Sequence, residues 1–352
     1  MRPLVSILIP AYNAEKTIAQ TLQSAIAQTW PRKEIIVVDD GSTDRTVEVV
    51  RRFGSRVTLV STENRGGQAA RNHAYSLCHG DYIQWLDADD LLAPDKLERQ
   101  LAALQGSDSR KILLSSAWGT FYYRTSRARF IPTPLWQDLS PIEWFIHRFT
   151  EYGSMQTCCW LTSRYLADTA GPWDTDLLVN QDGEYFARVV LASEAIRFVP
   201  GTGSLYRLSD RNRTSYIGNS DKKKASLLRT MELYIQYIRS LEDSERVRRA
   251  CLTFLQPVYP AFWDQPDYAA KLQNLAAQLQ GRLEEPRLRW KYAWMKPVFG
   301  WKAAKWAQTN LPRLREEFKA SWLRSYDRMM YWLEGDQFCF NPESERDISS
   351  YT

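Results

Sequence analysis

The first 117 residues alternate short apolar runs with longer stretches of helical periodicity. The apolar runs have the length of buried strands and lie at residues 5–9, 34–38, 57–60, 82–86 and 111–117. The stretches between them carry apolar residues along one helical face and cover residues 14–28, 43–53, 67–78 and 94–104. Strands and helices joined in this order by short connections predict a parallel sheet covered by helices on both faces. The alternation therefore assigns the chain to the α/β class.

The regular alternation ends after Trp118. We expect antiparallel strands within residues 121–130, further strands over 156–161 and 197–208, and helices over 141–149 and 181–192. These elements would complete one domain over residues 1–220. A helical, basic and tryptophan-rich region is expected over 221–340, and a loose polar tail over 341–352.

Composition and charge exclude several classes of protein. Of the 352 residues, 44% are hydrophobic and 25% charged, as in globular proteins. No run of about eighteen apolar residues is present, so no membrane-spanning helix is expected. Pro10 stops the N-terminal apolar run too early for a signal peptide. Five cysteines without a CxxC pair are typical of reduced thiols and predict a cytoplasmic location. The pair Cys158 and Cys159 is interpreted as buried residues of a strand, with redox chemistry as the alternative.

Three carboxylates, those of Asp87, Asp89 and Asp90, follow the strand expected over residues 82–86. Like charges this close repel one another, and a cation relieves the repulsion. Mg²⁺ and Mn²⁺ take oxygen ligands and leave positions open for phosphate oxygens. Because open α/β sheets bind ligands at the carboxyl ends of their strands, this stretch predicts a metal–diphosphate site.

The loops after the first two strands carry residues suited to binding a flat ring. Pro10 and Ala11 turn the chain without bulk and leave Tyr12 free to stack on a ring, although packing is an equally good explanation. Asp39 and Asp40 end the second strand. A carboxylate there can accept a hydrogen bond from the N3–H of uracil, and a tight turn with a helix cap is the alternative.

Two glycines open the helix after the third strand. Gly66 and Gly67 allow backbone N–H groups to approach an anion, with Asn64 just before them and Arg71 one turn further. A glycine-rich helix start is weak evidence by itself. The coincidence of these loops at one edge of one sheet is far more specific than any single loop.

Together the motifs resemble the family 2 glycosyltransferases. The matching segments are Val5–Asn13, Val38–Asp44, Asn64–Gly66, Ala70–Asn72 and Leu86–Asp90. The resemblance is dense over residues 4–105 and looser to about residue 215. It implies the GT-A fold, a Rossmann-like mixed sheet flanked by helices. It also implies inverting transfer from a nucleoside-diphosphate sugar, with Mn²⁺ or Mg²⁺ as cofactor.

The resemblance implies roles for individual residues as well. The base would be held by Pro10, Ala11, Tyr12 and Asp40, with Asp39 supporting the loop. Asn64, Gly66 and Arg71 would lie near the ribose and phosphates. The tetrapeptide Asp87-Ala88-Asp89-Asp90 matches the family's DxD element, so Asp89 is the expected metal ligand. Asp87 and Asp90 would contact ribose, water or metal.

An inverting transfer also needs a general base, which contributes about 10²–10⁴-fold to the rate. The segment from Gly171 to Arg188 resembles the family's second acidic motif, which usually reads Glu-Asp and here reads Gln181-Asp182. Asp182 is therefore the expected base, with Glu184 as the fallback. A favourable helix cap is the other explanation of these acids.

A later loop, residues 206–213, contains Arg207, Arg211 and Arg213. By the resemblance, a tyrosine-arginine loop here can fold over the diphosphate, and Arg207 is the first candidate. Ser209 stands where the family commonly has a histidine. Solvated loop charges are an equally good explanation.

Residues 287–328 carry eleven Lys and Arg against three acidic residues, so the remainder of this chain of net charge +5 is slightly acidic. Trp290, Trp294 and Trp301 share one helical face, interrupted at Pro297. Basic residues between interfacial aromatic rings suit a helix lying on an anionic membrane, so residues 286–335 could attach the protein to the inner face of a membrane. The alternative is that the rings pack against the catalytic domain or a second subunit. The acidic residues expected at the active-site face argue against nucleic acid as a binding partner.

The sequence therefore predicts an inverting, metal-dependent glycosyltransferase. It would move a sugar, from a UDP-sugar by preference, to a hydroxyl of a saccharide, lipid-linked or other acceptor in bacterial-type polysaccharide, glycolipid or glycoconjugate assembly. One alternative is a sugar-phosphate nucleotidyltransferase, which would want a basic, Gly-rich loop where Pro10–Asn13 stands. Another is a degenerate transferase domain acting as a binding module, which Gln181 keeps open. The sugar, the linkage and the oligomeric state are not encoded in any motif found.

Overall fold

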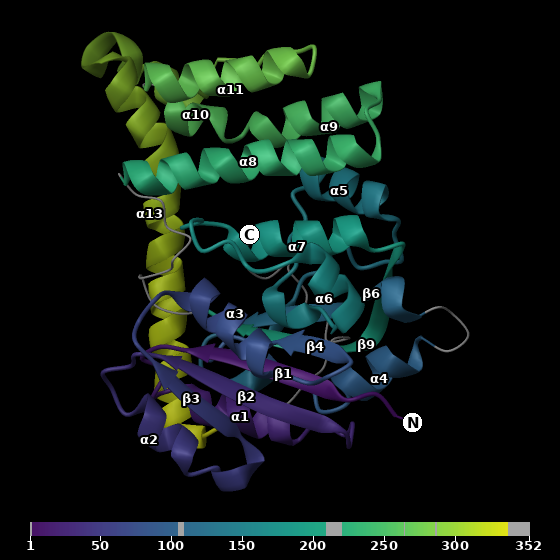
Figure 1. Cartoon of the computed structure of the whole chain (residues 1–352). Coiled ribbons are helices and arrows are strands. Elements are labelled where there is room, and N and C mark those ends of the chain that lie inside the picture. The colour runs from purple at the N-terminus through teal and green to yellow at the C-terminus, as the bar shows by residue number, and fades with distance from the viewer. Residues whose placement is uncertain (1, 105–108, 209–219, 264, 286, 337–352) are drawn as a thin grey trace.

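A five-stranded sheet forms the centre of the N-terminal part of the chain (Figure 1). The structure is a computed structural model and describes residues 2–104, 109–208, 220–263, 265–285 and 287–336. The strand order is β3-β2-β1-β4-β8, and the strands are β1 (Val5–Ala11), β2 (Lys33–Asp40), β3 (Thr58–Thr62), β4 (Tyr82–Trp85) and β8 (Thr162–Ser163). The first four are parallel and β8 is antiparallel to β4. The predicted mixed sheet flanked by helices is confirmed.

The two faces of this sheet belong to two hydrophobic cores. Successive side chains of a strand point to opposite faces, so Ile7 and Ile9 enter one core while Leu8 enters the other. Helix α1 (Ile18–Ile26) covers the first face, and α3 (Gly67–Leu77) covers the second. Because both faces are buried, the strands read as continuous apolar runs.

Strand order decides where a ligand can enter. The chain proceeds from β1 to β2 and β3 on one side, whereas β4 pairs with the other side of β1. The loops that follow β1 and β4 therefore leave the sheet in different directions and open a crevice at the carboxyl ends of the strands.

A second sheet lies beside the first, in the order β5-β9-β6-β7. Its strands are β5 (Leu91–Leu92), β6 (Ile112–Phe121), β7 (Arg129–Phe130) and β9 (Ala195–Arg207). Strand β5 begins directly after Asp90, so the acidic segment Asp87–Asp90 connects the two sheets. Both of its ends are consequently fixed by paired strands.

The strand predicted over residues 156–161 is wrong. These residues contain a 3₁₀ turn, η4 (Thr157–Cys159), in which Cys158 and Cys159 are fully buried. Their carbonyl oxygens accept hydrogen bonds from the side-chain amides of Gln84 and Gln100 instead of from a neighbouring strand. The burial of both cysteines matches the prediction, and the buried side-chain amides explain why no strand is needed.

Several helices cover the sheets. They are α2 (Thr46–Arg51), α4 (Lys96–Ala102), α5 (Pro141–Thr150), α6 (Arg164–Ala170) and α7 (Gln181–Ala192), with 3₁₀ turns η1 (Gly54–Arg56), η2 (Ser109–Lys111) and η3 (Thr125–Arg127). Helix α7 has the predicted bounds, whereas α6 was missed. None of the helices in the described ranges is long and apolar enough to cross a bilayer.

The C-terminal part is helical. Its helices are α8 (Asp221–Leu241), α9 (Glu245–Leu255), α10 (Tyr259–Phe262), α11 (Pro266–Gln278), α12 (Trp290–Ala293) and α13 (Met295–Glu334). Figure 1 shows α8, α9 and α11 stacked beyond α5 and α7, and one cluster of buried side chains continues from the sheet to α11. The boundary near residue 220 stays a prediction, and the expected tail 341–352 lies outside the described residues.

Helix α13 runs along one side of the molecule from this helical layer to the sheets (Figure 1), with a break at Gly300, whose φ is 79°. The expectation that the tail's tryptophans pack against the catalytic domain does not hold for this chain alone, because the described rings are exposed: Trp290, Trp294, Trp306, Trp322 and Trp332.

Candidate active site

A cavity of about 1520 Å³ opens at the carboxyl ends of β1, β2 and β4. Most of the residues expected to bind the donor line it, namely Pro10, Ala11, Tyr12, Asp40, Asn64, Gly66, Arg71, Asp87, Ala88 and Asp89. Asp182 lines the same cavity from the start of α7. Asp39 is the exception, because it is buried and does not line the cavity. Residues from five separate stretches of sequence thus meet in one place.

The loop after β1 is fixed by Asn13. Its side-chain oxygen accepts a hydrogen bond from the backbone N–H of Thr43 at 2.8 Å, and its own N–H donates to the Ser42 hydroxyl at 2.9 Å. Asn13 adopts a positive φ of 48°, which asparagine tolerates better than most residues. The preceding residue, Tyr12, is 52% exposed at the mouth of the cavity, where its ring is available for stacking.

Asp40 organises the loop after β3. Its two carboxylate oxygens accept hydrogen bonds from the backbone N–H groups of Arg65 and Gly66 at 2.8 and 2.9 Å. Gly66 has a φ of 93° and precedes α3, a conformation that suits glycine. The Asp39 carboxylate accepts from the N–H of Ser42 at 3.3 Å, so it braces its own turn.

Arg71 is already engaged within the cavity wall. Its guanidinium donates to the Asp87 carboxylate at 2.5 Å and lies over the Trp173 ring at 4.6 Å. The two charged side chains are only 15% and 30% exposed, so solvent screens the pair weakly. Arg71 therefore fixes the orientation of Asp87.

Burial and mutual repulsion both raise the pKa values of carboxyl groups in the acidic segment. Burial, followed by the charge of Asp87, raises the pKa of Asp89 to about 6. Burial also raises the pKa of Asp90 well above its usual range, with smaller contributions from Cys158 and Asp89. One oxygen of Asp90 accepts from the backbone N–H of Arg207 at 2.9 Å, and the other has no partner among the described residues.

Arg207 holds the acidic segment from the end of β9. Its guanidinium donates to the Asp89 carbonyl at 2.9 Å, the Tyr122 carbonyl at 3.2 Å and the Gln20 side chain at 2.6 Å. The side chain also lies over Phe121 at 4.3 Å. Arg207 lines the cavity, but its donors are largely committed to protein oxygens. Ser209, Arg211 and Arg213 lie outside the described residues.

The residues present fit a divalent cation that a substrate helps to bind. In the part of the chain that the structure describes, no group of three or more His, Cys, Asp or Glu side chains is arranged to hold a metal. Mg²⁺ is often bound by only one or two carboxylates, and substrate phosphates complete its shell. Asp87 and Asp89 both line the cavity. Burial is the larger cause of the raised pKa of Asp89, and a cation would relieve the second cause, repulsion by Asp87.

A close contact with α8 fixes the start of α7. The amide of Asn180 donates to the Tyr234 hydroxyl at 3.1 Å, and Asn180 has a left-handed φ of 57°. A Cβ atom at Gly183 would overlap that same hydroxyl. Glycine at position 183 thus allows Tyr234 to hold the turn that carries Asp182.

Glu184, the fallback base, does not face the cavity. It is 2% exposed, pairs with the Arg188 guanidinium at 2.8 Å and accepts a hydrogen bond from the Tyr237 hydroxyl at 2.7 Å. Residues two apart on a helix point to different sides, which separates Glu184 from Asp182. The fallback is therefore wrong, and Asp182 remains the candidate.

Sequence reasoning missed one wall of the cavity. Four of its lining residues come from the C-terminal part of α13: Arg324, Arg328, Tyr331 and Trp332. The only local sign in the sequence is Asp327, an isolated acid within a basic helix that turns out to be 7% exposed.

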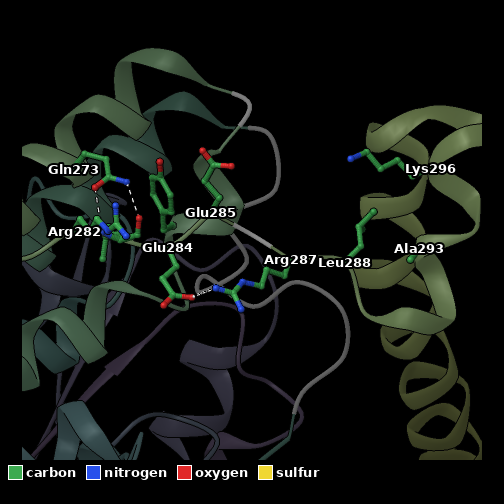
Figure 2. Close-up of a pocket in the computed structure, with 10 residues that line it drawn as sticks. Gln273, Arg282, Glu284, Glu285, Arg287, Leu288, Ala293 and Lys296 are labelled. Carbon is green, nitrogen blue, oxygen red and sulfur yellow. Dashed lines mark hydrogen bonds and ion pairs between the residues drawn. The ribbon is translucent and has the colours of Figure 1, made fainter.

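A second cavity, of about 950 Å³, lies between the chain after α11 and the start of α13. Figure 2 shows Lys296 and Ala293 on one wall and Gln273 and Arg282 on the other. None of the predicted site residues lines it, and its charged pair, Glu284 and Arg287, is exposed.

The sequence is similar to those of known glycosyltransferases. The model of glycosyl transferase family 2 matches residues 6–169. An uncharacterized glycosyltransferase of Rickettsia typhi is 38% identical over 112 residues, which are 32% of this chain and 35% of that protein. Chondroitin synthase of Escherichia coli is 46% identical over 99 residues, or 27% of this chain and 14% of that enzyme. The chain thus matches about a third or less of the length of these relatives.

Among solved structures, S. aureus TarS 1–349 in complex with UDP-GlcNAc aligns with a TM-score of 0.62 over 78% of this chain and 80% of that chain. At 18% identity, this likeness shows the fold. The chain therefore has the GT-A type fold. Residues 6–169 are similar to glycosyl transferase family 2.

Proposed function

We propose that the chain is an inverting glycosyltransferase that takes a sugar from a nucleoside-diphosphate sugar and delivers it to an acceptor hydroxyl. One observation carries the proposal: a single cavity gathers the exposed ring of Tyr12, the acidic pair Asp87 and Asp89, and the carboxylate of Asp182. The Tyr12 ring suits the nucleotide base, and the acidic pair suits a cation that binds the diphosphate. The Asp182 carboxylate suits the proton of the acceptor hydroxyl.

The donor would bind across the crevice between the loops after β1 and β4. Tyr12 stacks on the base. Each carboxylate oxygen of Asp40 accepts one backbone hydrogen bond and keeps a second lone pair. That lone pair suits the N3–H of uracil, which favours a UDP-sugar. Asp87 and Asp89 would hold Mn²⁺ or Mg²⁺, and the ion when bound supplies positive charge that stabilises the departing diphosphate.

Asp182 removes the proton of the acceptor hydroxyl. Inversion in a single displacement requires the attacking oxygen and the leaving group on opposite sides of the anomeric carbon. The cavity supplies the two sets of groups from separate elements, with Asp182 on α7 and the acidic segment between β4 and β5. Proton removal by a placed carboxylate contributes about 10²–10⁴-fold.

The acceptor class follows from the relatives only in outline. Similarity to chondroitin synthase supports a saccharide acceptor in polysaccharide, glycolipid or glycoconjugate assembly. The UDP-GlcNAc bound by S. aureus TarS supports a UDP-sugar donor. The cavity is larger than the roughly 300–1,000 Å³ of an ordinary ligand pocket, which leaves space for donor and acceptor together.

The test is release of nucleoside diphosphate from UDP-, GDP- and dTDP-sugars, with Mn²⁺ and with a chelator. We expect UDP release that requires the metal and is abolished in Asp89→Ala, because that variant weakens metal and donor binding. Wild-type release in the presence of chelator would overturn the assignment of the acidic segment. Binding of UDP without release from any sugar nucleotide would favour the degenerate binding module that Gln181 leaves open.

We also propose that α12 and α13 attach the protein to an anionic membrane surface, as at the inner face of a membrane. Trp290, Trp294 and Trp322 are 87%, 61% and 62% exposed, with exposed Lys291 and Lys296 beside the first two. Such a surface suits lipid headgroups. Sedimentation with anionic liposomes should fall in a Trp290→Ser, Trp294→Ser variant, with neutral liposomes as the control. Unchanged sedimentation of this variant would contradict the proposed attachment to the membrane.

A further inference from the structure

The C-terminal part of α13 forms a wall of the substrate cavity. Arg324, Arg328 and Tyr331 line the same space as Asp87 and Asp89, although more than 230 residues separate them in the sequence. Figure 1 shows how this arises, because α13 extends along the side of the molecule down to the two sheets. The wall is therefore built by the long helix and not by a local loop.

Two acidic residues fasten this segment to the catalytic domain. Asp327 accepts hydrogen bonds from the backbone N–H groups of Tyr123 and Arg124 and from the Arg124 guanidinium, the last at 2.7 Å. Asp336 accepts from the N–H and the hydroxyl of Thr125 at 2.9 and 3.1 Å. Both acids bind the chain that leaves β6, so the end of α13 has a fixed position.

Helical spacing then sets which side chains face the cavity. Residues 324, 328 and 331 follow one another at intervals of four and three, which places them along one stripe of the helix. The Arg324 guanidinium lies 6.0 Å from the Tyr122 ring, and the rings of Tyr331 and Tyr123 are 6.2 Å apart. The stripe thus presents two guanidinium groups and a phenol to the cavity.

The charged groups on the cavity walls indicate a role for Arg324 and Arg328 in binding an anion. Its walls carry five aspartates, Asp40, Asp44, Asp87, Asp89 and Asp182. Of the other cationic side chains on these walls, Arg71 is paired with Asp87, Arg207 donates to three protein oxygens, and Lys16 lies just before α1. A diphosphate entering this space needs further positive charge. Arg328 is exposed, and no described residue forms an ion pair with it.

We infer that Arg324 and Arg328 bind the diphosphate of the donor from the side opposite to the sheet loops that hold its base. This inference rests on the proposed function, since it requires a nucleoside diphosphate in the cavity. The planar guanidinium group matches phosphate oxygens and forms paired, charge-assisted hydrogen bonds. Helix α13 is thereby part of the donor site of this chain.

Isothermal titration of the full chain with UDP and with uridine, in the presence of Mn²⁺, tests the inference. The variants are Arg328→Gln and Arg324→Gln with Arg328→Gln. Lys319→Gln is the control, because it removes a charge from the same helix outside the cavity. We expect the Kd for UDP to rise by roughly tenfold or more in the double variant. The Kd for uridine should stay within about twofold, and Lys319→Gln should match the wild type for both.

An unchanged Kd for UDP in the double variant would overturn the inference, as would an equal loss of uridine affinity. If the wild-type protein binds none of UDP, GDP and dTDP, that result contradicts the proposed function and not only the inference about α13. Arg328 is exposed, so we expect Arg328→Gln alone to keep the fold. This single variant replaces the double variant in the binding test if the double variant is unstable. That single variant should still weaken UDP binding and reduce the dependence of the Kd on salt, because one phosphate contact is lost.

Discussion

The guanidinium of Arg124 donates a hydrogen bond to the carboxylate of Asp327 at 2.7 Å across 203 residues of sequence. The two side chains are only 5% and 10% exposed. The pair links the end of the second sheet to the C-terminal helix, and through that link a helix remote in sequence reaches the substrate cavity. The chain that leaves β6 and helix α13 are therefore joined beside the cavity.

Replacing Asp327 should loosen this link. In Asp327→Asn, the buried Arg124 guanidinium loses the charge of Asp327, which we expect to lower the free energy of unfolding by about 3 kcal/mol. Chemical denaturation measures this loss. The Kd for UDP should also rise, because Arg324 and Arg328 lose their fixed position.

The matched control is Glu245→Gln, which removes an ion pair with Arg249 whose two side chains are 74% and 76% exposed. This change should alter the free energy of unfolding by at most about 1 kcal/mol. Equal effects of the two substitutions would show that the link between Arg124 and Asp327 does not hold α13.

Gly183→Ala should impair turnover more than donor binding. The added methyl group would overlap the Tyr234 hydroxyl and displace the turn that carries Asp182. Since small misplacements of a catalytic group can cost about 10²-fold, we expect kcat to fall by that order while the Kd for UDP is retained. A wild-type kcat in Gly183→Ala would refute the role of this contact.

Lys96 should make stability depend on pH. Its ammonium group is fully buried and donates to Gln84 and Gln100, and burial lowers its pKa from 10.5 to about 7. Between pH 10.5 and 7 the unfolded chain takes up a proton that the folded chain refuses, so this group destabilises the fold progressively as pH falls.

Lys96→Met removes that dependence. The difference in free energy of unfolding between wild type and Lys96→Met, measured from pH 7 to pH 10, should therefore increase in favour of the wild type as pH rises. Parallel curves for the two proteins would contradict the lowered pKa of Lys96.

The sequence predicts the parts of the site that local patterns determine. Parallel strands must bring their carboxyl ends to one edge, so the meeting of Tyr12, Asp40 and Asp89 follows from strand order. Helical rotation also separates Asp182 from Glu184, and that argument needed only the bounds of α7. The choice between the two acids was therefore within reach of the sequence.

Other parts depend on contacts that no local pattern contains. The turn at Cys158 and Cys159 exists because Gln84 and Gln100, distant in sequence, satisfy its carbonyl groups. The α13 wall depends on the pairing of Arg124 with Asp327. Arg207 has the charge expected of a phosphate ligand, yet its β9 position directs it to protein oxygens.

The most direct test of the central claim compares Asp182→Asn with the wild type in two assays, release of UDP from a UDP-sugar and equilibrium binding of UDP. If Asp182 is the base, kcat falls by about 10²–10⁴-fold while the Kd for UDP stays within about twofold. Glu184→Gln, which changes a carboxylate outside the cavity, should leave kcat within about tenfold. A wild-type kcat in Asp182→Asn would contradict the account.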